Sequence, residues 1–547
     1  MAAAETSGSA APQPAAMPGA APAAAGAPTR IPWLGIVAVL LGTFISTLNT
    51  RLTSFGLADI RGAVHAGFDE GAWITTAQTV AQMLIAPAAV WLGYVYGSRR
   101  ILMEAALGFA LVSAIEPFAT NLPMLLALQF VGGLCSGCFV PLTLSFILRN
   151  VPPAAWAYGV AVYALNLEVS LNISASIEGW YVEHLSWRWI FWQNVPLALG
   201  MAACLGFGVK ALPPVDPQRR PDWFGIFTGG AGLALIYAGL DQGNRLDWTS
   251  SGVVWGTVLA GSVLIIGFLI AESRARYPAV DLKVAFTAPM PRLLLLFVFL
   301  RLTILSTAII IPQFLQTVRG YHALEVGHTM VWIAAPQLAV CVAAGFVLRR
   351  FDSRLVASVG FICVCIACWL VADGLTPLWG SREFLPSSLL QSMGQSFALS
   401  GTVFFAVLHL KPEDSLTFGA CLQTARLMGG ELGTAFVTTF VRVRGQIASN
   451  LLGQHVQIGD PQVLARIAAY GAATARGDPA LATARGTAVL GNAVHAASVT
   501  QGIIDAFVVL AVATAVTVML VVTRRAAPAD HPAAPRPIFR RRAGRPA

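Results

Sequence analysis

Charged side chains are scarce in this 547-residue sequence, where Asp, Glu, Lys and Arg make up 11% and hydrophobic residues 56%. Soluble domains carry about 25% charged residues, so a water-soluble fold of this length would lack the polar surface to cover itself. The scarcity excludes an ordinary soluble protein and predicts an all-α polytopic membrane protein. In a membrane protein the net charge of +9 reflects which segments face the cytoplasm. It is therefore not evidence for a nucleic-acid partner, and none is expected.

Several chemical signatures are also missing. All eight cysteines, including the Cys135-Ser-Gly-Cys138 pair, fall inside apolar runs, which argues against a disulfide framework and favours small residues in packed helices. The histidines show no metal-ligand spacing, and the chain has no Gly-x4-Gly-Lys-Ser/Thr, HExxH or nucleophile motif. We expect no cofactor, no metal and no enzymatic activity, and ATP-driven transport would need a separate subunit.

What the sequence does have is fourteen apolar runs, each near the ~20 residues that cross a bilayer. They are expected at 32–57, 72–96, 101–119, 123–148, 156–181, 190–211, 223–241, 252–271, 292–316, 327–348, 355–375, 384–409, 416–441 and 501–523. Residues 1–30 are rich in Ala, Pro, Gly and Ser, which predicts a disordered tail and not a cleaved signal peptide. The one long hydrophilic insert, 442–500, has a helical pattern near its middle.

The distribution of positive charge predicts an orientation. With the N-terminus in the cytoplasm, most Lys and Arg residues fall in cytoplasmic segments, among them Arg99, Arg100 and the basic tail 524–547, as the positive-inside rule requires. An even number of crossings returns the C-terminus to the cytoplasm. The sequence therefore predicts a protein of the bacterial inner membrane with both termini cytoplasmic and segment 442–500 in the periplasm.

Five stretches carry a resemblance to a known family. They are LQFVGGLCSGCFVP (128–141), WRWIFWQNVP (187–196), IPQFLQTVRGYHALEVG (311–327), RLMGGELG (426–433) and GIIDAF (502–507). Their order and spacing resemble the fourteen-helix drug:proton antiporters of the major facilitator superfamily, the EmrB/QacA type. The resemblance implies two six-helix bundles joined by two inserted helices, with alternating access between them.

The implied organisation divides the chain at the following limits. A cytoplasmic tail at 1–30 precedes the first bundle at 31–212, the linker with two inserted helices at 213–289, the second bundle at 290–523 and the basic cytoplasmic tail at 524–547.

The sequence departs from the family pattern at positions that matter for coupling. Where the family has an acid in helix 1 this chain has Asn49, and where it has a buried arginine in helix 4 this chain has Gln129. The loop after helix 2 keeps Arg99 and Arg100 but has Tyr94 at the acid's place, and helix 5 lacks its Gly-Pro repeat. The coupling of proton and substrate transport that is typical of the family is therefore not assumed to hold unchanged for this chain.

Arg51 is the most informative of the unusual residues, because it lies within the first predicted crossing. A midspan arginine costs about 2.5–3.5 kcal/mol on insertion scales, so it must face water or a partner. It serves either as a structural ion pair or as a substrate or coupling residue. We expect it to bind an anionic substrate group, and to pair with Glu168 or Glu178 of the polar fifth crossing when the site is empty.

Other polar residues complete the candidate site. Glu168 is the candidate proton carrier and shares a helix face with Asn172. Arg301 either snorkels or contributes to the site, and Arg426 with Glu431 forms a structural or gating pair in a motif with Gly429 and Gly430. Neutral polar groups expected near the cavity are Gln78, Gln82, Gln313 and Gln316, and Gln129 is a further candidate for the substrate or coupling site.

These observations favour a secondary active exporter of drug-like or toxic organic compounds, coupled to protons, with a tilt towards anionic or aromatic acid substrates. The resemblance also implies a periplasmic adaptor protein and an outer-membrane channel as candidate partners, with 442–500 as one candidate contact. The alternatives are an importer or facilitator of a small metabolite, a non-transporting membrane sensor, and a membrane-embedded enzyme.

Overall fold

The computed structural model describes residues 33–523 apart from 209–217, 219, 276–277, 279, 287–289, 411–413, 458 and 475–478. Within those residues the chain forms helices and no strand. The predicted tails 1–30 and 524–547, and the predicted domain limits at 212, 213 and 289, lie outside the described residues.

Each of the predicted crossings is mainly helical over its described residues. The first bundle contains α1 (Trp33–Phe55), α4 (Trp73–Tyr96), α5 (Ser98–Ile115), α6 and α7 (Leu122–Gly137, Phe139–Asn150), α8 (Trp156–His184), and α9 and α10 (Trp189–Trp192, Asn194–Gly208). The inserted pair is α11 (Trp223–Leu246) and α12 (Gly252–Arg274). The second bundle contains α14 (Met290–Leu305), α15 (Ile311–Thr317), α16 (Ala323–Arg350), α17 (Ser353–Gly374), α18 (Leu385–Val407), α19 (Ser415–Gly453) and α21 (Pro479–Val522).

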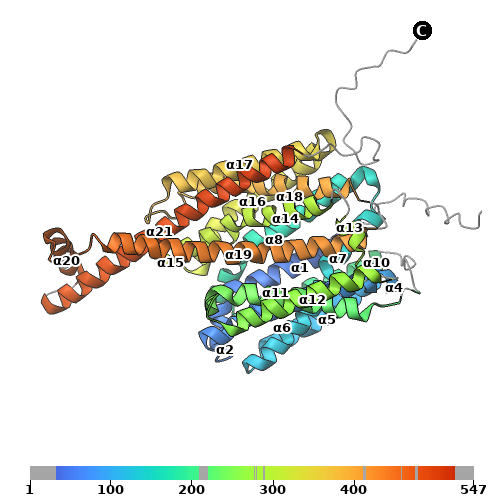
Figure 1. Ribbon diagram of the computed structural model, residues 1–547, viewed down its shortest axis with the longest axis horizontal. Helices are drawn as coiled ribbons and strands as arrows, with labels where there is room; N and C mark the ends of the chain where they lie inside the picture. The colour runs from blue at the N-terminus through green and yellow to red at the C-terminus, as the bar shows by residue number, and fades with distance from the viewer. Residues whose placement is uncertain are drawn as a thin grey trace, which may run out of the picture.

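Short helices complete the described chain. They are α2 (Leu57–Ala63), α3 (Phe68–Gly71), α13 (Leu282–Phe286) and α20 (Pro461–Thr474). Figure 1 shows the helices of the first bundle, in blue and cyan, beside those of the second, in yellow to red.

Twelve helical segments of the described chain are long and apolar enough to cross a membrane by length and composition. The two predicted crossings outside that set, 384–409 and 416–441, hold α18 and α19. Both are rich in polar residues, and every Ser and Gln of α18 is buried. A helix shielded by its neighbours needs no apolar face towards lipid, which explains why α18 has the length of a crossing without the hydropathy of one.

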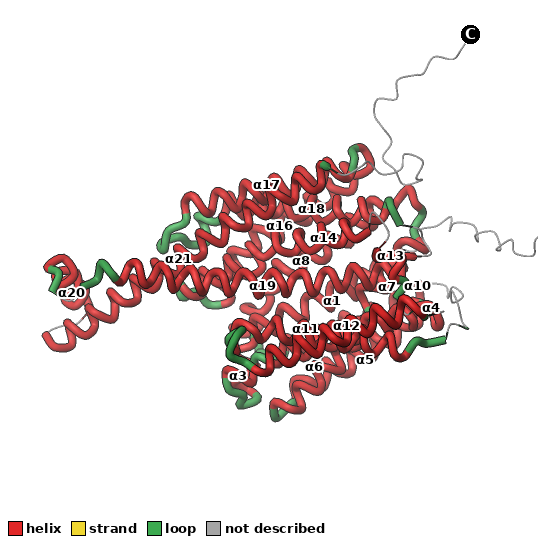
Figure 2. The backbone as a smooth tube through the Cα atoms, viewed as in Figure 1, coloured by secondary structure: helices red, strands yellow, loops and turns green. Residues whose placement is uncertain are grey.

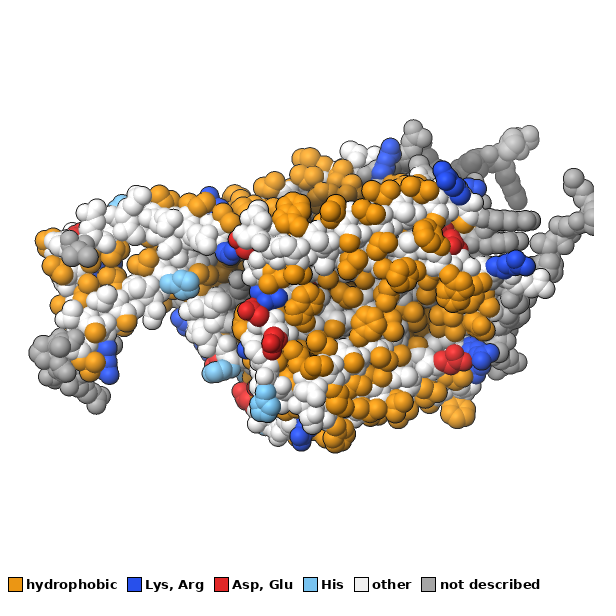
Figure 3. All heavy atoms as spheres, turned by 60° about the horizontal axis from the view of Figure 1, so that its bottom comes forward, with side chains coloured by type: hydrophobic (Ala, Val, Ile, Leu, Met, Phe, Trp, Pro, Cys, Tyr) orange, Lys and Arg blue, Asp and Glu red, His pale blue; other side chains and the backbone are white. Residues whose placement is uncertain are grey.

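The outer surface fits a membrane. Figure 3 shows hydrophobic side chains spread over the helical body, with acidic and basic side chains gathered towards its two ends. The inserted α12 illustrates this exposure, because only Val254, Gly261 and Glu272 of its residues are buried. A broad apolar face of this kind is what lipid contact requires.

The two bundles meet closely along α8 and α16. A Cβ added at Gly327 of α16 would lie 2.6 Å from the Cα of Ser176 in α8, so only glycine allows this approach. The hydroxyl of Ser176 donates to the carbonyl of Gly327 at 2.8 Å. On the opposite side, α11 packs against both α4 and α19 and therefore touches both bundles.

The insert 442–500 is largely helical and not a loop. Helix α19 continues to Gly453, α20 covers Pro461–Thr474 as the sequence pattern predicted, and α21 begins at Pro479. Figures 1 and 2 show α19 and α21 running far beyond the other helices, with α20 at their end. With 39 residues, α19 is about 58 Å long, roughly twice the ~30 Å hydrocarbon core. The side of the membrane on which this projection lies stays a prediction.

Candidate functional site

Arg51 lies at a cavity between the bundles, on the face of α1 that also carries Ser46, Thr47 and Thr50. Its Nη2 donates to the carbonyl of Ala308, which belongs to a π-helical turn at Ser306–Ile310 between α14 and α15. Its guanidinium lies 5.4 Å from the ring centroid of Phe55. A π-helical turn shifts the backbone hydrogen-bond register, and Ala308 offers its carbonyl to the side chain of another helix.

The predicted ion pair of Arg51 with Glu168 or Glu178 is wrong. The ion pairs among the described residues do not include Arg51, and its Nε has no hydrogen-bond partner. The partner that sequence reasoning sought on α8 is instead a main-chain carbonyl of the second bundle.

Arg301 and Arg426 line the same cavity of about 120 Å³. Arg426 donates from Nε to Gln423 Oε1 at 3.0 Å and from Nη1 to Thr47 Oγ1 at 3.4 Å. Arg301 sits against α19, where a Cβ at Gly430 would lie 3.4 Å from its Nη2, and its Nε has no partner. Arg301 does not snorkel, and it is an electrostatic neighbour of both other arginines.

Glycine at 429 and 430 allows α19 to lie close to α14. A Cβ at Gly429 would lie 3.0 Å from the Cα of Val298, which is tighter than nearly all real Cβ contacts. The motif glycines therefore bring Arg426 and Arg301 to one place.

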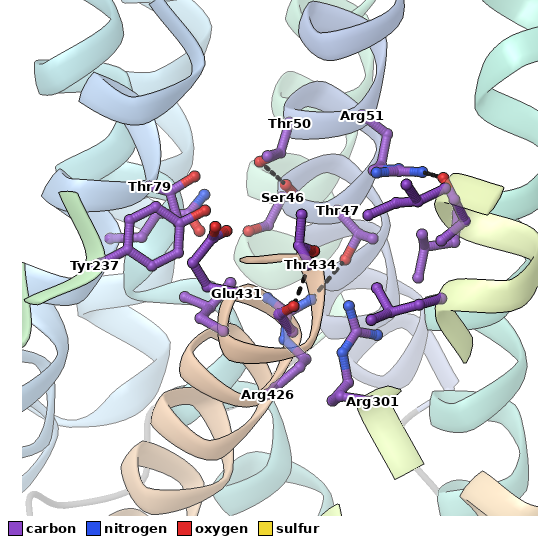
Figure 4. A pocket seen from close by; sticks show the side chains of 17 residues that line it. Ser46, Thr47, Thr50, Arg51, Thr79, Tyr237, Arg301, Arg426, Glu431 and Thr434 are labelled. Carbon is purple, nitrogen blue, oxygen red and sulfur yellow. Dashed lines mark hydrogen bonds between the residues drawn. The ribbon is translucent and has the colours of Figure 1, made fainter. Parts of the chain in front are cut away.

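The opposite wall of the cavity is acidic and comes partly from the inserted helix. Tyr237 of α11 lies beside Glu431 of α19 and Thr79 of α4. One turn further along α11, Asp241 accepts hydrogen bonds from Thr76 Oγ1 and, at 2.9 Å, from Gln242 Nε2. Figure 4 shows Tyr237 and Glu431 on one side of the cavity and Arg51 and Arg301 on the other.

The predicted Arg426–Glu431 pair is also wrong. The two side chains are five residues apart on α19, so they point about 140° away from each other. Glu431 turns to Tyr237, and Arg426 turns to Gln423 and Thr47. Both residues line the cavity, from different sides.

A second hollow of about 410 Å³ continues the first and shares eight of its lining residues, including Arg51, Tyr237 and Glu431. It adds Asp241 and the two α15 glutamines, Gln313 and Gln316. Both glutamines therefore lie at the cavity as predicted. Tyr237 and Asp241 were not predicted, because the only signal is a Tyr and an Asp four residues apart near the end of an inserted crossing.

Glu168 is 1% exposed, and neither of its carboxylate oxygens has a hydrogen-bond partner. Its electrostatic neighbour is Arg301, and it does not line the cavity. One turn on, Asn172 Nδ2 donates to Gln337 Oε1 at 3.2 Å and to Gln395 Oε1 at 3.4 Å. Helix α8 thus carries an enclosed carboxyl group and an amide link to the second bundle.

The amide link continues into the second bundle. Gln395 Nε2 donates to Thr307 Oγ1 at 2.8 Å, and Ser306 Oγ donates to Gln391 Oε1 at 2.8 Å. Both hydroxyls belong to the π-helical turn that holds Arg51. Sequence reasoning did not single out Gln337, Gln391 or Gln395, because glutamine in a membrane helix does not reveal which neighbour it faces.

Four predicted residues lie away from the cavity. Asn49 accepts a hydrogen bond from Asn194 Nδ2 at 2.6 Å and so joins α1 to α10. Gln78 and Gln129 are buried without side-chain partners. Glu178 is buried near Gly56 and is an electrostatic neighbour of Asp59. None of the four lines the cavity.

Arg99 and Arg100 also lie elsewhere. Arg99 donates to the carbonyls of Leu205 and Gly206 at 3.0 and 3.1 Å, so it satisfies the last carbonyls of α10. Arg100 forms an exposed ion pair with Glu104 at 2.8 Å. Within the described residues no group of three His, Cys, Asp or Glu is placed to hold a metal ion.

A charged cavity enclosed between two bundles of membrane-spanning helices is the architecture of a secondary transporter. Residues 39–434 match the model of the Major Facilitator Superfamily, and the chain belongs to that superfamily of transporters. It is a multi-pass membrane protein.

Comparisons with individual proteins agree with this family. The chain is 25% identical to the probable multidrug resistance protein EmrY of Escherichia coli K12, over 74% of this chain and 80% of that protein. It is 23% identical to the fatty acid resistance protein FarB of Neisseria gonorrhoeae, over 76% and 82%. Its fold is similar to that of the human organic anion transporter MFSD10, with a TM-score of 0.53 at 14% identity over 90% of this chain and 98% of that one.

Proposed function

We propose that this protein is a proton-coupled exporter of organic anions in a bacterial inner membrane. The observation that carries the proposal is the cationic wall, which we define as Arg51, Arg301 and Arg426. Three guanidiniums line one cavity, and none of them is ion-paired with a carboxylate of the described residues. Buried guanidinium donors without full partners favour a bound carboxylate or other oxyanion, because each unpaired donor costs free energy.

The relatives support export. Their printed names describe multidrug resistance in one case and fatty acid resistance in another, and fatty acids are carboxylates. An anionic substrate is therefore compatible with both the cavity and a named relative.

Glu168 is our candidate for the coupling group. Protonation would remove a negative charge beside Arg301 and favour anion binding there, so proton and anion occupancy are linked. Antiport then requires a fixed order of events. The anion leaves on the periplasmic face before Glu168 takes up its proton there, and water or a bulk anion solvates Arg301 meanwhile.

The projection formed by 442–500 is our candidate contact for a periplasmic adaptor. It carries a hollow of about 520 Å³ lined mainly by apolar residues of α19, α20 and α21. Exposed apolar side chains on the projection include Leu451 and Leu464. Exposed apolar surface on a projecting segment favours a protein partner.

The test is uptake of labelled 4-methylbenzoate into inside-out membrane vesicles that contain the protein. An exporter accumulates the anion when the vesicle interior is acidified, whereas a facilitator only equilibrates it. Arg51→Gln and Arg301→Gln should reduce uptake about tenfold or more, as expected for loss of a charged hydrogen bond worth about 1.5–3 kcal/mol. Arg292→Gln, on the same helix as Arg301 but exposed, is the matched control, and normal uptake by both cavity variants would refute the proposal.

A further inference from the structure

The wall of the cavity opposite the arginines is acidic, and two of its three residues belong to the inserted helix α11. We call Asp241, Glu431 and Tyr237 the acidic wall. Asp241 and Tyr237 come from the inserted α11, and Glu431 comes from α19. Glu431 is 7% exposed, and the two carboxyl groups are electrostatic neighbours.

The carboxyl groups of the acidic wall lie among neutral polar groups. Asp241 accepts hydrogen bonds from the hydroxyl of Thr76 and the amide of Gln242, and Glu431 lies beside the hydroxyl of Tyr237. Among the described residues neither carboxyl group forms an ion pair. Arg245 is an electrostatic neighbour of Asp241, but it is partly buried and is itself bound to Asp69 at 2.7 Å and to Gln242 Oε1 at 2.8 Å. Neutral polar groups therefore surround the two carboxyl groups, and the cationic neighbour of Asp241 is already ion-paired with Asp69.

A second observation marks this wall as a binding surface. Ser46 is 1% exposed, it lines the cavity, and its hydroxyl has no hydrogen-bond partner. In Figure 4 that hydroxyl points across the cavity towards Glu431. A buried hydroxyl without a partner costs free energy until a ligand satisfies it.

The cavity is therefore bipolar, with guanidiniums on one side and carboxyl groups on the other. We propose that its substrates are zwitterionic aromatic or amphiphilic compounds, whose anionic group binds the cationic wall while an ammonium group binds the acidic wall. This inference rests on the proposed function and narrows its substrate class. It also makes α11 a working part of the transport site. A plain anion satisfies only one of the two walls, and a plain cation only the other.

The test uses three compounds built on one ring. They are 4-(aminomethyl)benzoate, which is zwitterionic, 4-methylbenzoate, which is anionic, and 4-methylbenzylamine, which is cationic. Binding to the purified full-length protein in detergent is measured by calorimetry at pH 7. We expect the zwitterion to bind about tenfold more tightly than the anion, a difference of about 1.4 kcal/mol, and the cation to bind most weakly.

Variants assign the preference to the acidic wall. Asp241→Asn should remove the advantage of the zwitterion and leave the Kd of 4-methylbenzoate within about twofold of the unmodified protein, since a twofold change is well under 1.4 kcal/mol. Glu431→Gln, on a different helix, should do the same and guards against misfolding of one variant. Asp373→Asn, an exposed acid of α17, is the matched control and should change neither affinity.

The outcomes separate this inference from the function on which it rests. Equal binding of zwitterion and anion by the unmodified protein, no binding of the zwitterion, or an equal loss of both ligands in Asp241→Asn would overturn the bipolar site. Arg51→Gln tests the other wall, because it should weaken both carboxylate-bearing compounds. If Arg51→Gln leaves the affinity for 4-methylbenzoate unchanged, the proposal of anion export is refuted. The comparison of zwitterion and anion binding in Asp241→Asn still tests the acidic wall in that case.

Discussion

At the scale of single residues, Arg51 shows how a guanidinium is accommodated within a membrane-spanning helix. Among the described residues the side chain has no ion-pair partner, and it is not directed to the membrane surface. The second bundle offers it the carbonyl of Ala308, and the ring of Phe55 lies one turn further along α1 itself. A carbonyl acceptor satisfies a donor without cancelling its charge. The positive charge therefore remains available to a ligand in the cavity.

Glu168 gives the prediction about coupling. Glu168→Gln keeps the size of the side chain and removes its charge and its titration, so we expect anion binding to persist while accumulation driven by a pH gradient is lost. Exchange of 4-methylbenzoate across vesicles without a gradient should continue. The measurement compares the two modes in the same vesicle preparation, and full gradient-driven accumulation by the variant would rule out Glu168 as the coupling group.

Asn49 gives a prediction about stability. Its Oδ1 accepts a 2.6 Å hydrogen bond from Asn194, and both residues are buried. Asn49→Ala should lower the stability of the protein by about 1–3 kcal/mol, because it leaves a buried amide donor unsatisfied, while the affinity for 4-methylbenzoate stays unchanged. Thermal unfolding in detergent measures the first effect, with Asn450→Ala at an exposed site as the control. A weakened ligand affinity would instead place Asn49 in the binding site.

At the scale of helices, the inserted α11 depends on one close approach. A Cβ at Gly230 would lie 2.2 Å from the carbonyl oxygen of Leu84 in α4. Gly230→Leu should push α11 away from α4 at a cost of about 1–3 kcal/mol, displacing Tyr237 and Asp241 and reducing transport several-fold. Gly256→Leu on α12, where a Cβ meets nothing within 4 Å, is the matched control. Equal transport by the two variants would show that α11 is only a spacer.

The helices also show what the sequence can and cannot predict. The crossings were predictable because lipid demands about 20 apolar residues each, and the family motifs supplied the bundle order. Residues such as Arg51, Gln313 and Gln316 were placed at the cavity because polar groups in a crossing need a polar neighbour. The identity of that neighbour was not predictable from the sequence. Arg426 and Glu431 are close in the sequence, for example, but they lie on different faces of α19. The contribution of α11 depends on packing between helices far apart in the chain.

At the scale of the whole molecule, the orientation of the projection is the prediction to check first. Asn450 of α19 is exposed and lies within 442–500. In a variant without the native cysteines, Asn450→Cys should react with a membrane-impermeant maleimide in cells whose outer membrane alone has been made permeable. Reaction only after the inner membrane is opened would place the projection in the cytoplasm and reverse the proposed topology.

The length of α19 has a mechanical consequence. Helix α19 runs without interruption from Ser415 to Gly453, so the segment that carries Glu431 in the cavity and the tip of the projection move as one rod. The tip lies 22 residues beyond Glu431, or about 33 Å along the helix. A tilt of about 10° at the cavity would sweep the tip through about 6 Å at that length. A rocking step of the second bundle would therefore displace the far end of α19 further than it displaces Glu431.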